Sequence, residues 1–422
     1  MKRITPLTIL AGTCIAAQIA QATPTVEFQT DSMLFSCDNM SSDGRYVCGN
    51  ARGLSGFFPE GTFIWDTQTG IITLLNTAGK DAVAITEDGS TVVGDTLVEG
   101  TPGDPNSWAE EASYWTESAG FWQSIGFLPN AMQCPSRSNA YDISADGSVI
   151  VGLSWDGCSG RGFRWTEATG MQELESLANG SNRASVVSAD GSVIAGFAQG
   201  TFNRTPAVWD GTTLQGTLLG PNGADAEGEV LGMSDDGSVL LGTVYLDGPD
   251  FAYDAVKWVN GQVEMIGNGS LLSGWGGNAQ DIADDGTVIG FDFLQGNRRP
   301  WIQPQGEGPL MELNEWAIAH GAEIPEDWEL IVPKAISNDG TTIVGFGFEP
   351  TGIFGWRLVI TPGDTPCDGD ANGDQMVDLA DLNLVLANFG TASEEGDLDD
   401  SGAVDLADLN LVLANFGNSC DG

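Results

Sequence analysis

The sequence predicts an all-β domain of seven repeated four-stranded units, followed by a small all-α domain. Two internal repeats support this expectation. A short motif with the dipeptide Asp-Gly occurs seven times between residues 43 and 340, and the string VDLADLNLVLANFG occurs twice after residue 376. Repetition of this kind is the signature of a fold assembled from copies of one supersecondary unit.

Each Asp-Gly motif predicts a β-hairpin. The motif follows a short strand-like run and precedes a β-branched run that ends in glycine, as in SADGSVIVG and SNDGTTIVG. Asp-Gly between two such runs favours a tight hairpin, because the turn requires positive φ. Each unit continues to a tryptophan and, in most units, to a last short strand. The motif aspartates are Asp43, Asp88, Asp146, Asp190, Asp236, Asp285 and Asp339, and the tryptophans are Trp65, Trp115, Trp165, Trp209, Trp258, Trp301 and Trp356.

Seven such units, each of roughly 45–50 residues, predict a seven-bladed β-propeller over residues 23–362. The seventh unit stops after FGWRLVI and lacks its last strand. A strand-like segment at residues 26–30 precedes the first unit, and we expect it to complete the last blade and close the ring. The repeated aspartates and tryptophans are interpreted as turn and packing residues, because catalytic residues do not recur in every unit.

The repeat resembles the HAF extracellular repeat family. The resemblance rests on units of the form A-x-x-I-S-x-D-G-x-x-V-V-G followed by A-F-x-W, and on the segment MELNEWAIAHGAEIPEDW before the last unit; it covers residues 33–360. The histidine for which the family is named is absent. The resemblance implies an exported repeat protein and no particular activity, since a fold alone does not define a function.

Two acidic loops, GDANGDQM and GDLDDSGA, precede the two copies of the C-terminal string and predict two Ca²⁺ sites. Ca²⁺ takes oxygen ligands from alternating positions of a short loop. The apolar residues after each loop have helical spacing, which an unstructured acidic tail would lack. The predicted ligands are Asp370, Asn372, Asp374, the Met376 carbonyl, Asp378 and Asp381 for one ion, and Asp397, Asp399, Ser401, the Ala403 carbonyl, Asp405 and Asp408 for the other.

The predicted C-terminal domain, residues 363–422, resembles the type I dockerin family. The resemblance implies a calcium-dependent docking domain and a cohesin-like partner protein. Aspartate at loop position 12 is the habit of this family, whereas Gln375 stands at a position where glycine is usual. In the family, loop positions 10 and 11 help to select the partner, and the matching residues here are Leu379, Ala380, Leu406 and Ala407. These residues are apolar, unlike many cellulosomal examples.

Residues 1–22 have the features of a signal peptide. Lys2 and Arg3 precede a mostly apolar stretch, and Ala20-Gln21-Ala22 fits a cleavage site with small residues. The apolar stretch is too short and too interrupted for a transmembrane helix. We therefore expect a secreted or cell-surface protein without membrane insertion.

Export predicts that the cysteines form disulfides. The chain has seven cysteines, and without Cys14 of the predicted signal peptide six remain, which permit fifteen pairings. Proximity in the sequence favours Cys37–Cys48, Cys134–Cys158 and Cys367–Cys420. A zinc site fits less well, because no two cysteines have two-residue spacing.

The net charge of −44 argues against nucleic acids and anionic membrane surfaces as partners. The only histidine, His320, lies in a predicted helical insert, away from any nucleophile motif that a Ser-His-Asp triad would need. These observations favour a non-catalytic protein. Paired carboxylates for glycoside hydrolysis stay open as an alternative, because acidic residues are abundant.

One face of the predicted propeller is a candidate ligand surface. The loops between the second and third strands of each unit and between successive units share this face, opposite the Asp-Gly turns. Their aromatic rings and guanidinium groups suit an anionic polysaccharide; alternatively, long loops simply collect exposed residues. The candidates are Trp108, Trp155, Trp275, Arg52, Arg137, Arg161, Arg183, Arg204, Arg298 and Arg299.

The predicted function is therefore a secreted binding or scaffold protein, held in place through the calcium-binding domain, with a ligand on the propeller face. Two alternatives stay open. One is a component of extracellular polysaccharide degradation, and the other is a structural surface-layer protein.

Overall fold

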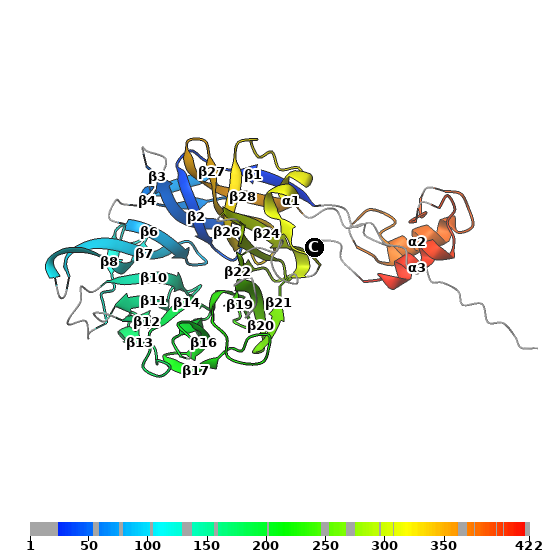
Figure 1. The fold of residues 1–422 in the computed structure, drawn as a ribbon. Coiled ribbons are helices and arrows are strands. Elements are labelled where there is room, and N and C mark those ends of the chain that lie inside the picture. The colour runs from blue at the N-terminus through cyan, green and yellow to red at the C-terminus, as the bar shows by residue number, and fades with distance from the viewer. Residues whose placement is uncertain are drawn as a thin grey trace, which may run out of the picture. The chain divides into compact units, whose positions relative to one another are not determined.

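The computed structural model describes residues 24–53, 59–75, 79–101, 104–128, 137–155, 159–200, 202–245, 253–266, 275–294, 297–306, 308–361, 369–374, 376–393, 395–399 and 401–417. Thr25–Thr361 is one compact unit, and the described C-terminal residues belong to a second. Strands dominate the first unit, whereas the second contains helices α2 (Leu379–Asn388) and α3 (Leu406–Ala414) (Figure 1). Among the described residues, no helix combines the length and apolar character needed to cross a membrane.

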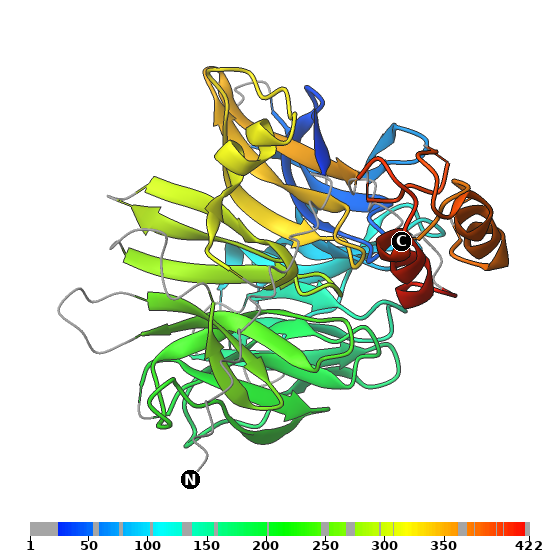
Figure 2. The same cartoon turned by 90° about the vertical axis from the view of Figure 1, so that its right-hand side faces the viewer.

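The first unit is a seven-bladed β-propeller. Its described residues form seven four-stranded sheets, all with antiparallel neighbours. Figure 1 shows the sheets following one another around a ring, and Figure 2 shows the same ring after a quarter turn. The predicted fold class of this unit is confirmed.

The strand bounds are as follows. Blade 1 contains β2 (Leu34–Met40), β3 (Tyr46–Arg52), β4 (Pro59–Asp66) and β5 (Ile71–Leu74). Blade 2 contains β6 (Gly79–Ile85), β7 (Thr91–Thr101), β8 (Asp104–Thr116) and β9 (Trp122–Ser124). Blade 3 contains β10 (Ser138–Ile143), β11 (Ile150–Trp155), β12 (Gly160–Thr166) and β13 (Gly170–Glu173).

The remaining blades repeat this order. Blade 4 contains β14 (Asn182–Val187), β15 (Val193–Ala198), β16 (Thr205–Asp210) and β17 (Thr213–Thr217). Blade 5 contains β18 (Gly228–Met233), β19 (Val239–Tyr245), β20 (Tyr253–Val259) and β21 (Gln262–Met265). Blade 6 contains β22 (Trp275–Ile282), β23 (Val288–Leu294), β24 (Asn297–Gln303) and β25 (Met311–Glu312). Blade 7 contains β26 (Glu329–Ile336), β27 (Thr342–Glu349), β28 (Gly352–Thr361) and β1 (Thr25–Gln29).

Strand β1 closes the ring, as the sequence predicted. It pairs antiparallel with β28, from Thr25 opposite Thr361 to Gln29 opposite Arg357. Phe28 packs edge-on against Trp328 and Phe354, with ring centroids 6.3 and 6.2 Å away. The last blade therefore combines the two ends of the propeller chain, and no edge of β28 is left open.

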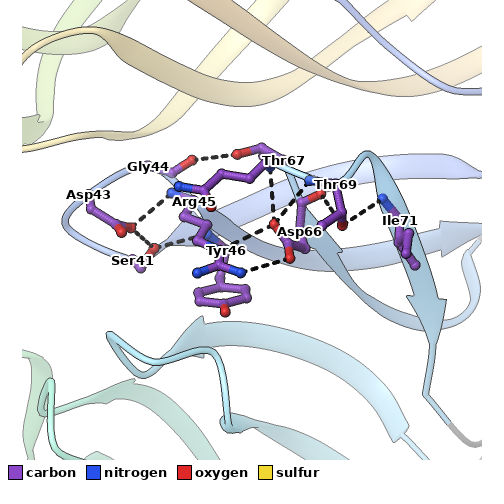
Figure 3. A network of polar contacts seen from close by, with 10 residues as sticks. Ser41, Asp43, Gly44, Arg45, Tyr46, Asp66, Thr67, Thr69 and Ile71 are labelled. Atoms are coloured by element: carbon purple, nitrogen blue, oxygen red, sulfur yellow. Dashed lines mark hydrogen bonds and ion pairs between the residues drawn. The ribbon is translucent and has the colours of Figure 1, made fainter.

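The Asp-Gly turns are held by the aspartate itself, as Figure 3 shows for blade 1. Asp43 Oδ1 accepts hydrogen bonds from the Ser41 hydroxyl (2.6 Å) and from the backbone N–H of Arg45 (2.9 Å). The Arg45 guanidinium pairs with Asp66 at 3.1 Å, which ties the turn to the end of β4. Equivalent bonds recur at Asp88, Asp146, Asp190, Asp236 and Asp339. The predicted structural role of these aspartates is confirmed.

Apolar side chains packed between neighbouring sheets form the core. Val149 and Val151 of blade 3, for example, share a cluster with Trp209 of blade 4. Among the repeated tryptophans, Trp65 and Trp115 are 8% and 7% exposed, and Trp209, Trp258, Trp301 and Trp356 are at most 1% exposed. Trp165 differs, because it is partly exposed at the edge of its cluster. The predicted packing role therefore holds fully for six of the seven.

A short insert between blades 6 and 7 carries the only histidine. It contains helix α1 (Leu313–Ala319), and a 3₁₀ turn, η1 (Pro304–Gly306), lies just after β24. His320 ends α1, and its Nδ1 lies 2.6 Å from the Trp316 carbonyl oxygen. The backbone N–H of Val26 donates to the His320 carbonyl at 2.8 Å, so the insert also anchors β1.

The predicted disulfide between Cys37 and Cys48 is wrong, because both are free thiols. They lie on the neighbouring strands β2 and β3, but Cys37 packs with Ala335 and Val344 of blade 7, whereas Cys48 packs with Ala82 and other residues of blade 2. Their side chains therefore point to opposite faces of one sheet, which rules out a bond. The predicted pairs Cys134–Cys158 and Cys367–Cys420 lie outside the described residues.

Candidate functional site

The C-terminal unit is built from two matching halves. Asp378 and Asp405 are the N-caps of α2 and α3, and each forms a capping box with the third helical residue. Val377, Val385, Val404 and Val412 form the buried centre. The N–H of Gly390 donates to the Val404 carbonyl and the N–H of Gly417 to the Val377 carbonyl, both at 2.8 Å. These reciprocal bonds join the two halves in an approximately two-fold arrangement.

Three carboxylates converge in each half. Oxygen atoms of Asp370, Asp374 and Asp381 lie within 4.8 Å of one another, and so do those of Asp397, Asp399 and Asp408. Arg357 is the last basic residue of the sequence, so no lysine or arginine within the C-terminal unit neutralises either group. A hard cation with oxygen ligands fits this donor set, because it would remove the repulsion between the carboxylates.

The inner aspartate of each group is fixed by backbone amides. Asp381 and Asp408 are fully buried. Asp408 accepts hydrogen bonds from the N–H groups of Leu398 and Asp405, both at 2.7 Å. Burial opposes its ionisation, but these amides outweigh burial and lower the pKa of the carboxyl. These hydrogen bonds from backbone amides stabilise the ionised form of the carboxyl group at the last loop position, independently of any bound ion.

The other predicted ligands have different contacts. Asp378 and Asp405 accept from the backbone N–H of Ala380 (2.6 Å) and Ala407 (2.7 Å), as expected of helix caps. The Asn372 side chain donates to Asp374 at 3.0 Å. In the second loop, the Ser401 hydroxyl donates to the Ala403 carbonyl at 3.2 Å. Met376 follows Gln375, which lies outside the described residues.

The residues predicted to contact a partner are all exposed. Leu379 and Leu406 are 63% and 64% exposed, and Ala380 and Ala407 are exposed beside them. Leu386 and Phe389 are among the apolar residues at helical spacing after the first loop, and both are exposed, as are their counterparts Leu413 and Phe416. The duplicated sequence was the signal from which these exposed residues could have been predicted. A unit this small cannot bury all the apolar residues of two identical helices.

The predicted ligand residues of the propeller lie at one end of the blades, opposite the Asp-Gly turns, but in different blades. Arg52 belongs to blade 1, Arg161 to blade 3, Arg204 to blade 4 and Arg298 to blade 6. Trp155 ends β11, and Arg137 stacks over its ring at 5.4 Å. Trp108 lies in β8, within a long hairpin, and Trp275 is the first residue of β22; their side chains are outside the described atoms.

Most of these arginines have carboxylate partners within the propeller. Arg299 pairs with Asp292 through two bonds of 3.1 and 2.7 Å. Arg183 and Arg204 share Glu229, which is 3% exposed. Arg52 pairs with Glu349 and Arg161 with Glu173. Arg298 instead stacks over Phe291 and Phe293. The guanidinium groups of Arg52, Arg183 and Arg204 thus join neighbouring blades, and those of Arg161 and Arg299 join strands of one blade.

The centre of the propeller holds a polar cavity of about 460 Å³, lined by the first strand of every blade. Hydrogen bonds between successive Asp-Gly turns brace one end. The N–H of Ala145 donates to the Ala189 carbonyl (3.0 Å), and the N–H of Ala189 to the Asp235 carbonyl (2.9 Å). The Asp235 carboxylate accepts from Ser42 of blade 1 (2.8 Å) and Asn338 of blade 7 (2.7 Å), across the opening.

Two carboxyls in the cavity wall have strongly raised pKa values. Burial raises the pKa of Asp142 and of Asp281 to about 7, although each accepts backbone hydrogen bonds that act in the opposite direction. Asp142 accepts from Val187 of the next blade at 2.8 Å, and Asp281 from Ile336 of its next blade at 2.9 Å. Both residues therefore connect adjacent blades.

Two solved structures have a similar fold. One is the β-propeller domain of the trilobed protease from Pyrococcus furiosus, described as having an open velcro topology (TM-score 0.51, 11% identity, 77% of this chain and 95% of that chain). The other is oligogalacturonate lyase from Vibrio parahaemolyticus (TM-score 0.50, 11% identity, 81% and 98%). At this identity the likeness shows the fold alone. No protein-family model and no curated protein sequence matches this chain.

Proposed function

We propose that this protein is an exported, non-catalytic binding or scaffold protein that is attached to its partner through a calcium-dependent, dockerin-like C-terminal domain. The observation that supports this proposal best is the pair of three-carboxylate groups, each in a loop that leads into a capped helix. A propeller supplies a rigid ligand-binding body, and a small metal-dependent domain supplies attachment.

In this proposal, Asp370, Asp374 and Asp381 hold one Ca²⁺, and Asp397, Asp399 and Asp408 of the second loop hold another. The bound ions neutralise carboxylates that otherwise repel one another. When ligand groups are brought together only by folding, the free energy of metal binding also stabilises the fold. Chelation is therefore expected to unfold the C-terminal domain and leave the propeller intact.

The exposed apolar residues supply the docking surface. Leu379 and Leu406 occupy equivalent positions at the starts of α2 and α3, and Leu386 and Leu413 lie about two turns further along. Because the halves match, a partner surface that fits one half also fits the other after rotation. A cohesin-like protein is the partner class that we propose.

The test uses the full-length protein. Titration calorimetry is expected to count two Ca²⁺ sites, and limited proteolysis to cleave around α2 and α3 in EGTA but not in millimolar CaCl₂. The double variant Asp370→Ala with Asp397→Ala should lose both responses, whereas Glu395→Gln, which removes one charge outside the predicted ligands, should keep them. Identical cleavage with and without Ca²⁺ in the wild-type protein would reject the proposal.

A further inference from the structure

A second concave surface lies between blades 2 and 3, and none of the candidate ligand residues contributes to it. It is a groove of about 990 Å³, open to solvent, at the blade end that carries the Asp-Gly turns. Its walls come from β8 and β9 of blade 2 and from β12 and the β10–β11 turn of blade 3, which are neighbours in the ring (Figure 1). Grooves with aromatic walls and a few polar groups are the usual form of ligand sites.

The aromatic wall consists of Trp165 and Tyr114. Their ring centroids are 5.4 Å apart, and their planes are inclined by 40°. Trp165 occupies the repeat position at which the other six tryptophans are buried, yet it is partly exposed and lines the groove. Leaving a large ring accessible forfeits part of the free energy that burial supplies in the other blades. A ligand that covers the ring would recover it.

Unpartnered polar groups surround the rings. The Arg164 side chain lines the groove, and its buried Nε has no hydrogen-bond partner among the described residues. Gln123 extends into the groove from β9 and Glu167 from the end of β12, and neither has a protein partner among the described contacts. Thr116 and Ser118 also line the groove, but their hydroxyl groups are already paired with each other at 3.3 Å. The groove thus offers donors and acceptors beside a flat apolar surface.

The charges in the groove disfavour an anionic ligand. Arg164 is accompanied by Glu167 and by Asp146, whose carboxylate is already engaged by the Ser144 hydroxyl (2.8 Å) and the Ser148 N–H (2.9 Å). One cation with two carboxylates, on a chain of net charge −44, gives no attraction for carboxylate or sulfate groups. A neutral ligand with many hydroxyl groups avoids this repulsion. Its hydroxyl groups can still form hydrogen bonds with the amide of Gln123, the guanidinium of Arg164 and the carboxylate of Glu167.

We propose that this groove binds a neutral glycan, with a sugar ring stacked on Trp165 and Tyr114 and its hydroxyl groups bonded to Arg164, Gln123 and Glu167. The C–H face of a pyranose is apolar and covers an aromatic ring, while its hydroxyl groups point to the sides. This inference deepens the binding role proposed for the propeller, and it does not depend on the calcium loops. The proposed ligand differs in charge and in place from the anionic polysaccharide that the sequence predicted on the arginine-bearing face.

The test is calorimetric titration of the full-length protein with cellohexaose, mannohexaose and xylohexaose as neutral probes and oligogalacturonate as the acidic probe. At least one neutral probe is expected to bind, and Trp165→Ala should weaken it at least tenfold. Trp165→Phe should restore most of the affinity. Tyr253→Ala is the control, because Tyr253 is an exposed aromatic residue in β20 of blade 5, outside the groove.

Three results would overturn the inference: no neutral probe binds, the acidic probe binds more tightly, or binding survives Trp165→Ala. If Trp165→Ala does not fold, Gln123→Ala and Arg164→Gln replace it, and unchanged affinity in both rejects the site. Titrations repeated in EGTA separate this inference from the calcium proposal. Glycan binding that is unaffected by EGTA supports the groove, whatever the C-terminal domain does.

Discussion

Gly89, the glycine of the Asp-Gly turn in blade 2, shows how single residues couple neighbouring blades. Its φ is +70°, a region that glycine occupies at little cost. A Cβ at this position would lie 2.5 Å from the ring of Tyr46, which belongs to blade 1. The residue therefore meets two demands, one from its own turn and one from the blade beside it. The sequence predicted the first through the Asp-Gly dipeptide, but the second depends on a residue 43 positions away.

Comparison of Gly89→Ala with Gly70→Ala separates these demands. Gly70 has φ +71°, but a Cβ there meets nothing within 4 Å. We expect Gly70→Ala to lower the free energy of unfolding by about 1–2 kcal/mol, the cost of a left-handed conformation. Gly89→Ala should lower the free energy of unfolding by about 1–3 kcal/mol more than Gly70→Ala, because the ring of Tyr46 must move. Urea unfolding measures both, and equal losses would contradict the inter-blade contact.

At the scale of elements, β1 makes the ring continuous. Four of its contacts cross to distant parts of the chain: the ladder with β28, the ring contacts of Phe28, the bond from Val26 to His320, and the bond from Arg357 to Gln29 at 3.0 Å. The orphan strand before the first unit and the missing strand of the last unit were both visible in the sequence, so this closure could be predicted. The anchoring by α1 could not, because it involves a backbone carbonyl.

Val26→Ala tests the closure, since Val26 is 4% exposed and packs in the cluster of blade 7. We expect a loss of about 2 kcal/mol in unfolding free energy from the cavity it leaves. Glu27→Ala, on the exposed side of the same strand, should change little. Deleting residues 25–29 should expose the edge of β28 and cause association, which size-exclusion chromatography detects. A monomeric deletion variant with unchanged stability would show that β1 is dispensable.

Other elements could be predicted only in part, for identifiable reasons. Because side chains alternate along β2 and β3, Cys37 and Cys48 point to opposite faces of the blade 1 sheet. Their proximity in the sequence does not reveal this difference. Arg52 forms an ion pair with Glu349, and Arg204 forms one with Glu229. The arginines from which the sequence predicted a ligand face are therefore partly neutralised by residues distant in the sequence. Local turn chemistry, the repeats and the closing strand could be recognised in the sequence, whereas side-chain pairings between distant residues could not.

At the scale of the whole molecule, the propeller carries buried carboxyls with raised pKa values in different blades. Besides Asp142 and Asp281, burial raises the pKa of Asp95 to about 7, although it accepts bonds from Asn139 (2.7 Å) and from the N–H of Ala140 (3.2 Å). A carboxyl whose pKa is higher in the folded state favours folding when it is protonated. Its contribution is complete below the ordinary pKa near 4 and is lost as pH rises through about 7.

The melting temperature of the propeller is therefore expected to be higher at pH 5.5 than at pH 8.5. Histidines usually complicate this range, but His320 is the only one, and His320→Gln provides a background without it. In that background, Asp142→Asn with Asp281→Asn should reduce the pH dependence and leave the part due to Asp95, even if the melting temperatures at both pH values fall. Differential scanning calorimetry at constant ionic strength measures the slope, and a slope equal to that of the parent would contradict the assignment.

The pairing of β1 with β28 also has a mechanical consequence. Thr361 is the last residue of β28, and the chain continues from there toward the C-terminal domain, so a pull on that domain enters the propeller through β28. Strand β28 is bonded to β27 on one side and to β1 on the other. Tension along the strand loads both ladders in shear, so that many bonds must yield together instead of opening one by one. Closing the ring with the N-terminal strand thus reinforces the strand through which a tethered propeller would bear its load.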